Sequence, residues 1–305
     1  MAHWTAEDIP DLTGHTAVVT GANSGIGLHT ALQLARHGAR TVLAGRNQAK
    51  GTGALERIRA SVPDADVAWR ELDLADLTSV RAFAAGHTGK LDLLVNNAGV
   101  MMLPYRRTAD GFETQFGTNH LGHFALTGLL LPALLASPGA RVVTLSSPMH
   151  RNGRIDFDDL QSEHRYGRSP AYANSKLANL LFALELQRRV EAASVPLLSV
   201  AAHPGFAATN LGTSGGGFFN SVVLRIGMRI GQPAEIGALS PLYAATAPDV
   251  AGGEFIGPGS YGGMRGYPAR AEVAPQARDE ETARRLWTVS EELTGVTYDK
   301  LAPSL

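Results

Sequence analysis

The sequence of 305 residues contains no cysteine, which excludes disulfide bonds, cysteine-based zinc sites and thiol nucleophiles. Lysine is scarce as well: of the 27 basic residues only four are lysines, and the other 23 are arginines. There is no excess of charge of either sign, because the formal net charge is −1. Without a broad basic field, we do not expect nucleic acid as a partner.

A long apolar run is also missing. The most apolar long stretch, 124–136, is interrupted by Pro132 and is shorter than the roughly 20 residues that cross a bilayer. Residues 1–10 carry Glu7 and Asp8 and lack the apolar segment of a signal peptide. We therefore expect no membrane span and a soluble, cytoplasmic protein.

Short β-branched runs alternate with helical patterns along the chain, as in βαβ units with a parallel sheet. The runs predict strands at 16–20, 41–44, 67–72, 91–95, 141–145, 197–201 and 254–256. The helical patterns cover 25–37, 78–87, 110–136, 170–193, 234–246 and 279–293. The sequence therefore predicts an α/β, Rossmann-type, doubly wound fold, with a seven-stranded parallel sheet and helices on both faces, as one domain over 1–305.

A glycine-rich turn, TGANSGIG at 20–27, follows the first predicted strand. Glycines let the backbone turn sharply and approach a pyrophosphate closely, and the next helix offers free N–H groups to the anion. Such a string is a weak signal in a chain with 34 glycines, but here a strand precedes it and a helix follows. We predict a dinucleotide site that includes Gly21, Asn23, Ser24, Gly25, Ile26 and Gly27.

The end of the second predicted strand indicates which dinucleotide binds. An NAD enzyme places a carboxylate there, about 20 residues past the glycines, to hold the ribose 2′-OH. This chain reads LAGRN at 43–47, with no acid and with Arg46. Because a guanidinium can hold a 2′-phosphate through paired hydrogen bonds, we predict NADP(H). NAD(H) and a plain surface arginine stay open as alternatives.

Tyr172 and Lys176 stand four residues apart in the predicted helix 170–193, so the phenol and the ammonium share one helix face. Free tyrosine titrates near pH ~10, too high for ready proton exchange at neutral pH. A nearby ammonium and the positive ring of an oxidised nicotinamide would lower the pKa of this tyrosine. The spacing predicts Tyr172 as a proton-transfer residue for a carbonyl, and an ordinary Tyr–Lys helix pair is the alternative.

Polar residues end two of the predicted strands. The fifth strand ends in Leu145-Ser146-Ser147, and the fourth is followed by NNAG at 96–99. Ligands of open α/β sheets bind at this carboxyl edge, and a hydroxyl there can hydrogen-bond a substrate oxygen. Either motif alone would be read as strand-end capping, but together with Tyr172 they favour a catalytic site.

Taken together, these motifs resemble the short-chain dehydrogenase/reductase family over about residues 13–210. The family's strings occur in the expected order: TGANSGIG at 20–27, LDLAD at 72–76, NNAG at 96–99, GTNHLGHF at 117–124, LSS at 145–147, YANSK at 172–176 and HPG at 203–205. The fuller strings resemble the branch that contains retinol dehydrogenases and related carbonyl reductases.

The resemblance implies a role for each motif. Ser147 would orient the substrate oxygen, Tyr172 would act as acid/base, and Lys176 would hold the nicotinamide ribose and lower the pKa of Tyr172. Asn119 would anchor a water that connects Lys176 to bulk solvent. The remaining cofactor contacts would be Asp73 and Leu74 beside the adenine, Asn97 and Gly99 at the adenosine ribose, and Pro204, Gly205 and Thr209 at the nicotinamide.

Two features depart from the family's pattern. Retinol dehydrogenases usually carry an apolar N-terminal anchor that residues 1–10 do not resemble, which argues against a retinoid substrate. Ser24 stands where many NADPH enzymes of the family have a basic residue, so the NADP(H) prediction depends on Arg46 alone.

No metal site is expected. His120 and His123 stand three residues apart but lack a third ligand at zinc spacing. Asp156, Asp158 and Asp159 indicate a solvated loop more than a cation site. The run GTSGGG at 212–217 and the apolar stretch 218–230 predict a lid over 206–235, with a membrane-surface segment as the alternative.

The sequence therefore predicts an NADP(H)-dependent oxidoreductase that interconverts a small, rather apolar ketone or aldehyde and its alcohol. One alternative is a non-catalytic dinucleotide-sensing protein, although such a protein need not keep Ser147, Tyr172 and Lys176 together. Another is an NAD(P)-dependent lyase or epimerase, which usually needs a larger substrate domain. The predicted helices 110–136 and 170–193 are candidate faces for a homodimer or homotetramer, and a monomer stays open.

Overall fold

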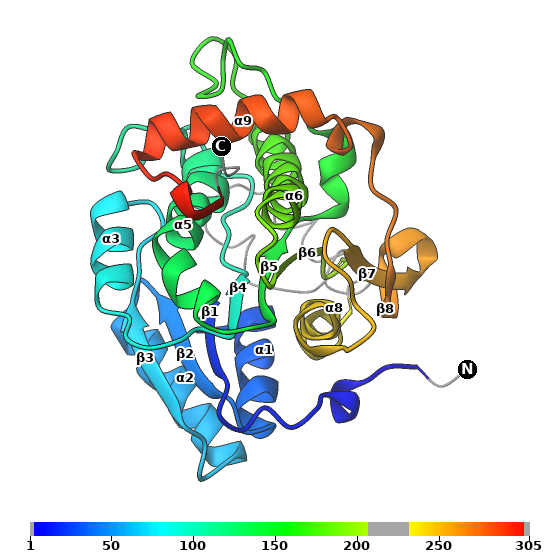
Figure 1. The fold of residues 1–305 in the computed structure, drawn as a ribbon. Coiled ribbons are helices and arrows are strands. Elements are labelled where there is room, and N and C mark those ends of the chain that lie inside the picture. The colour runs from blue at the N-terminus through cyan, green and yellow to red at the C-terminus, as the bar shows by residue number, and fades with distance from the viewer. Residues whose placement is uncertain (1–2, 207–231, 302–305) are drawn as a thin grey trace.

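A single eight-stranded sheet runs through the computed structural model of the chain, which describes residues 3–206 and 232–301 (Figure 1). The strand order is β3-β2-β1-β4-β5-β6-β7-β8. The strands are β1 Thr16–Thr20, β2 Arg40–Gly45, β3 Val67–Glu71, β4 Leu93–Asn96, β5 Ala140–Leu145, β6 Leu197–Ala202, β7 Phe255–Ser260 and β8 Arg265–Arg270. The order reverses direction between β1 and β4, where α/β sheets open a crevice for ligands at the carboxyl ends of their strands.

Helices cover both faces of the sheet (Figure 1). One face carries α1 (Gly25–Arg36), α2 (Gln48–Ser61) and α8 (Ala234–Thr246). The other carries α3 (Leu77–Ala85), α5 (Gly122–Leu135) and α6 (Arg168–Ala192), and α9 (Glu280–Thr294) packs along the outside of α6. The short α4 (Thr114–Phe116) precedes α5. The fold is thus the expected Rossmann-type, doubly wound α/β fold.

The sequence of β1 explains how the sheet holds two cores. Successive side chains of a strand point to opposite faces. Val18 therefore packs in the core under α3 and α5, and Val19 packs in the core under α1 and α8. Because both faces are covered, central strands read as continuous apolar runs rather than as alternating ones.

Two predictions about the elements are wrong. The sheet has eight strands instead of seven, because β8 pairs with β7 in antiparallel fashion. Its sequence, RGYPAR, carries a glycine and a proline, which weaken the strand signal, and proline is tolerated at such an edge strand. Helix α2 was not expected, because its sequence is polar, contains Gly51 and Gly53, and buries only Gly51, Ala54 and Ile58.

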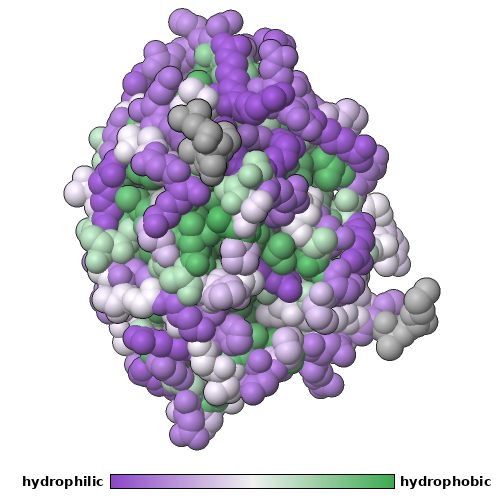
Figure 2. Space-filling view, viewed as in Figure 1, coloured by the Kyte–Doolittle hydropathy of each residue, from purple (hydrophilic) through white to green (hydrophobic). Residues whose placement is uncertain are grey.

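Hydrophilic residues form most of the rim of one face of the molecule, and apolar residues show in its middle, between the two helical layers (Figure 2). Among the described residues, no helix is long and apolar enough to cross a membrane.

Candidate functional site

The carboxyl ends of β1, β2, β4 and β5 open into one cleft of about 730 Å³. Most of the predicted site residues line it: Gly21, Asn23, Ser24, Gly25, Ile26, Gly27, Arg46, Asp73, Leu74, Asn97, Gly99, Tyr172, Lys176 and Pro204. Gly205 follows Pro204 at a positive φ of 66°. Thr209 and most of the predicted lid, 206–235, lie outside the described residues.

The turn after β1 has room only for glycine at two positions. A Cβ at Gly21 would lie 2.9 Å from the Cα of Ala98, and its φ of 66° already disfavours a side chain. A Cβ at Gly27 would lie 2.6 Å from the carbonyl oxygen of Gly21. The Asn97 amide closes the turn from β4 by donating to the Thr20 carbonyl at 2.7 Å. The turn and the end of β4 therefore form one close-packed cradle.

The start of α1 suits an anion. Its N-cap residue, Ser24, makes no side-chain capping bond, and its first turn holds no acidic residue. Side chains of Asn47, Asp76 and Asp279 cap α2, α3 and α9, whereas α6 and α8 lack a side-chain cap as α1 does but do not begin at the cleft. An uncapped helix start that opens into a cleft leaves N–H groups for a phosphate. The residues present thus fit the pyrophosphate of a dinucleotide.

The end of the cleft at β2 holds three cations. Arg46 lies there as predicted, and Lys50 and Arg57 of α2 also line the cleft. Within the described part of the chain, none of the three has an ion-pair partner. Lys50 and Arg57 were missed because α2 was missed. Lys50 and Arg57 stand seven residues apart, or two helical turns, and this spacing places both on one helix face. It was the signal from which the sequence could have identified them.

Tyr172 and Lys176 line the opposite end of the cleft, and Ser147 lies beside Tyr172. Tyr172 and Lys176 face the cleft from α6, with only 7% and 4% of their surfaces exposed. The Nζ of Lys176 donates to the Leu145 carbonyl at 3.0 Å and lies 5.9 Å from the centre of the Tyr172 ring. The Ser147 hydroxyl oxygen accepts from the Met149 N–H at 3.2 Å and lies close enough to Tyr172 to act on the pKa of its phenol. The hydroxyl of Ser146, which lines the cleft, donates to the Lys176 carbonyl at 2.7 Å, so its proton is already engaged.

Burial dominates the acid–base properties of this cluster. Burial raises the pKa of Tyr172 to about 12. The interaction with the Ser147 side chain lowers this pKa, but by less than burial raises it. Burial lowers the pKa of Lys176 to about 8. The protein's own residues therefore do not produce the lowered tyrosine pKa that the sequence suggested. They keep a neutral phenol beside an ammonium at neutral pH, and the positive ring of an oxidised nicotinamide would be the additional source of lowering.

Asn119 lies in a π-helical turn, Gly117–Leu121, within the region predicted as one helix. Its amide nitrogen donates to the Val100 carbonyl and to the Ser175 hydroxyl, both at 2.9 Å, and its side-chain oxygen accepts from the Val100 N–H at 2.7 Å. Both amide hydrogens are therefore engaged, and the water implied by the resemblance could use only the oxygen atoms of Asn119. π-turns of this kind occur often at functional sites.

His120 and His123 are buried and hydrogen-bonded within the fold, His120 Nε2 at 2.9 Å from the Ser290 hydroxyl oxygen. His123 Nδ1 donates to the Asn119 carbonyl at 2.9 Å, so its Nε2 accepts from the Thr20 hydroxyl at 2.9 Å. This histidine thus joins Asn119 to the phosphate-binding turn. Burial lowers the pKa of His123 to about 4, which keeps the ring neutral. In the described ranges, no group of three potential metal ligands occurs.

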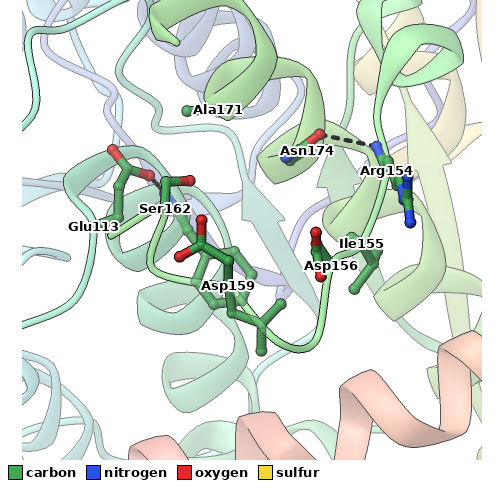
Figure 3. A pocket seen from close by; sticks show the side chains of 10 residues that line it. Glu113, Arg154, Ile155, Asp156, Asp159, Ser162, Ala171 and Asn174 are labelled. Atoms are coloured by element: carbon green, nitrogen blue, oxygen red, sulfur yellow. Dashed lines mark hydrogen bonds between the residues drawn. The ribbon is translucent and has the colours of Figure 1, made fainter. Parts of the chain in front are cut away.

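A second pocket, of about 20 Å³, lies beside the start of α6 and includes Asp156 and Asp159 (Figure 3). The Asp159 carboxylate accepts backbone N–H bonds from Glu163, His164 and Arg165. The carboxylate of Glu113, also in this pocket, caps α4. These acidic groups therefore shape loops and helix starts, in agreement with the loop interpretation.

Comparisons with known proteins agree with this geometry. A family model described as short chain dehydrogenase matches residues 15–215. Retinol dehydrogenase 12 of Homo sapiens is 45% identical over 295 residues, which cover 94% of this chain and 89% of that protein. The crystal structure of an uncharacterised protein from Mycobacterium paratuberculosis has a TM-score of 0.82 and 46% identity, covering 97% of this chain and 99% of the other. A short-chain dehydrogenase from Shigella flexneri 2a, solved with NADP, has a TM-score of 0.63 and 25% identity, covering 80% of this chain and 97% of that one.

Proposed function

Because the chain belongs to the short-chain dehydrogenase family, in the branch that resembles retinol dehydrogenases, we propose that it is an NADP(H)-dependent carbonyl reductase or alcohol dehydrogenase. Family membership makes it an oxidoreductase that acts on CH–OH groups. The observation that carries the proposal is that Tyr172, with Ser147 beside it, and Lys176 lie at one end of a cleft whose other end fits a dinucleotide.

The cofactor preference is supported by charge. Arg46, Lys50 and Arg57 place three cations at the end of the cleft where a 2′-phosphate would lie, and no carboxylate follows β2 at positions 46–50. The Shigella flexneri neighbour was solved with NADP. NAD(H) is the alternative, since a ribose hydroxyl also fits near these residues. When bound, the nicotinamide supplies or accepts the hydride.

Proton transfer to the substrate would be carried out by the chain's own residues. The Tyr172 phenol, with a pKa of about 12, stays protonated at neutral pH and can donate to the carbonyl oxygen as that oxygen gains charge. The Ser147 hydroxyl would hold the same oxygen. The Lys176 ammonium would stabilise the phenolate that forms, which then takes a proton back from solvent. In the direction of alcohol oxidation the same groups run in reverse.

The substrate is proposed to be an apolar aldehyde or ketone. Support comes from the apolar residues Val100, Leu103 and Leu145, which line the cleft together with Tyr172. Retinol is the alcohol in the name of the human relative, so retinal belongs in the panel of test substrates. A cytoplasmic location, a single domain over 1–305 and a homodimer or homotetramer stay predictions from the sequence.

The test is oxidation of NADPH and NADH by the purified protein with short aldehydes, decanal, all-trans-retinal, ketones and quinones. We expect alcohol formation in step with NADPH oxidation, and a kcat/KM with NADPH at least ~10-fold above that with NADH, as expected when a charge-assisted pair is gained. Dinucleotide binding without turnover of any substrate would favour the sensing protein instead. Substrate conversion without net oxidation of the dinucleotide would favour the lyase or epimerase.

A further inference from the structure

Residues 100–103, in the loop that follows β4, form part of the cleft wall beside the catalytic residues. Val100 and Leu103 line the same cleft as Tyr172 and Lys176. The run from Val100 to Leu103, VMML, is entirely apolar and only partly buried. An apolar wall next to the acid–base residue is suited to contact the carbon skeleton of a substrate rather than its oxygen.

Side chains outside the loop hold its backbone at three points. Asn119 binds both the N–H and the carbonyl of Val100. The side-chain oxygen of Gln115, one helical turn before Asn119, accepts from the Met102 N–H at 2.7 Å. The Tyr166 hydroxyl donates to the Leu103 carbonyl at 2.7 Å.

Gln115 and Tyr166 are also bound to each other. The Gln115 amide nitrogen donates to the Tyr166 oxygen and to the Arg168 carbonyl, both at 3.0 Å. Since both amide hydrogens are used and the amide oxygen holds Met102, the orientation of this buried side chain is fixed. Burial and the nearby Glu113 carboxylate raise the pKa of Tyr166 to about 12, so its hydroxyl remains a donor at any working pH.

The loop needs such support because its backbone is strained. Met102 has a φ of 53°, in the left-handed region that side chains other than glycine rarely adopt. Strain of this kind persists only where the surroundings over-determine the conformation, and it clusters at functional sites. Here the bonds to Met102 and Leu103 come from Gln115 and Tyr166, neither of which lines the cleft itself.

We propose that Gln115 and Tyr166 are positioning residues that fix the apolar segment 100–103 as the substrate-facing wall, and so set the selectivity for bulky apolar carbonyl substrates. The inference rests on the proposed reductase function. A small aldehyde needs only Ser147 and Tyr172, whereas a long or branched one gains affinity from a wall that is already ordered. Loosening the loop should therefore raise KM for bulky substrates alone.

The test compares Tyr166→Phe with Tyr105→Phe. Both remove one phenol oxygen, but the side chain of the exposed Tyr105 makes no hydrogen bond to the backbone of 100–103; its ring packs edge-on against Tyr166 and it also interacts with the Arg107 side chain. Tyr166→Phe removes the bond to the Leu103 carbonyl and the bond accepted from Gln115. With NADPH, we therefore expect it to raise KM for decanal and all-trans-retinal about 10-fold, with KM for propanal and every kcat within about twofold. Tyr105→Phe should match the wild type.

Two further measurements keep the outcome decisive. Gln115→Glu retains the acceptor for Met102 but loses both donors, so it should shift the same KM values in the same direction. Hydrogen exchange of the loop amides should be faster in both variants, while the dissociation constant for NADPH stays unchanged.

Equal KM changes for propanal and decanal, unchanged selectivity, unchanged loop exchange or a weakened NADPH complex would each overturn the inference. Wild-type protein that reduces none of the probes would overturn the proposed function, and this inference with it.

Discussion

At the phosphate end of the cleft, one continuous segment, 20–27, supplies both the tight turn and the uncapped helix start. The catalytic end is assembled from distant pieces: Ser147 after β5, Tyr172 and Lys176 on α6, and a loop after β4 held by Gln115 and Tyr166. The first is defined by local backbone geometry and the second by long-range hydrogen bonds. Changes at the two ends should therefore affect different steps, cofactor binding at one and proton transfer or substrate selection at the other.

The largest expected effect is that of Tyr172→Phe. Removing the hydroxyl that protonates the substrate oxygen should lower kcat for carbonyl reduction at least ~100-fold, the lower range for a positioned acid–base group. Steady-state kinetics with NADPH and decanal measures it. Because the phosphate end is untouched, the dissociation constant for NADPH should stay within about twofold of the wild-type value. Unchanged turnover would remove Tyr172 from the mechanism.

Gly27→Ala should weaken cofactor binding at the phosphate end of the cleft. The added methyl would overlap the Gly21 carbonyl, 2.6 Å away, so the turn must shift. Overpacking of this kind costs about 1–3 kcal/mol. Where the shifted turn binds the pyrophosphate more weakly by that amount, the NADPH dissociation constant rises about 5- to 150-fold. Fluorescence titration measures the constant, and kcat at saturating NADPH should be nearly unchanged. A variant that loses kcat but binds NADPH normally would contradict the division between the two ends.

Arg46→Asp should change which cofactor is preferred without changing the chemistry. A carboxylate would repel a 2′-phosphate and could accept a hydrogen bond from a ribose 2′-OH. We expect the ratio of kcat/KM values for NADPH and NADH to fall about 10-fold, limited by the remaining Lys50 and Arg57. Arg284→Asp makes the same charge change on an exposed position of α9 and serves as the control. Retained NADPH selectivity in Arg46→Asp would refute the cofactor assignment.

The last prediction concerns stability rather than catalysis, at His123, which joins Asn119 to the phosphate-binding turn. Burial lowers its pKa from 6.5 to about 4. Between these values the unfolded chain binds more protons than the folded one, so the free energy of unfolding should fall as the pH drops, by about 1.4 kcal/mol per pH unit for this residue. Urea unfolding at several pH values between 6.5 and 4 measures the slope. His123→Asn should make the slope shallower by that amount, and an unaltered slope would show that His123 is not buried and neutral.

The same contrast explains how far the sequence could predict the molecule. The cofactor turn was predictable because strand, glycines and helix are neighbours in the chain. Helix α2 was not, since Gly51 is a poor helix residue that is needed only because Trp69 of β3 packs against its backbone. That contact joins positions 18 residues apart and leaves no local signal.

At the catalytic end, the sequence identified the reacting groups but not their supports. Tyr172 and Lys176 were visible through their helical spacing. Gln115 and Tyr166 stand 51 residues apart and meet only through the fold, so neither was singled out. The rise in the pKa of Tyr172 was not foreseen either, because it depends on burial, which spacing alone does not reveal.

The most direct test of this account is a crystal structure with NADP⁺ bound. We expect the pyrophosphate against the 20–27 turn, the 2′-phosphate beside Arg46, and the nicotinamide ring facing the Tyr172 hydroxyl with room for one carbonyl between them. A nicotinamide placed away from Tyr172, or a hydroxyl shielded from the ring by other side chains, would contradict the proposed reaction.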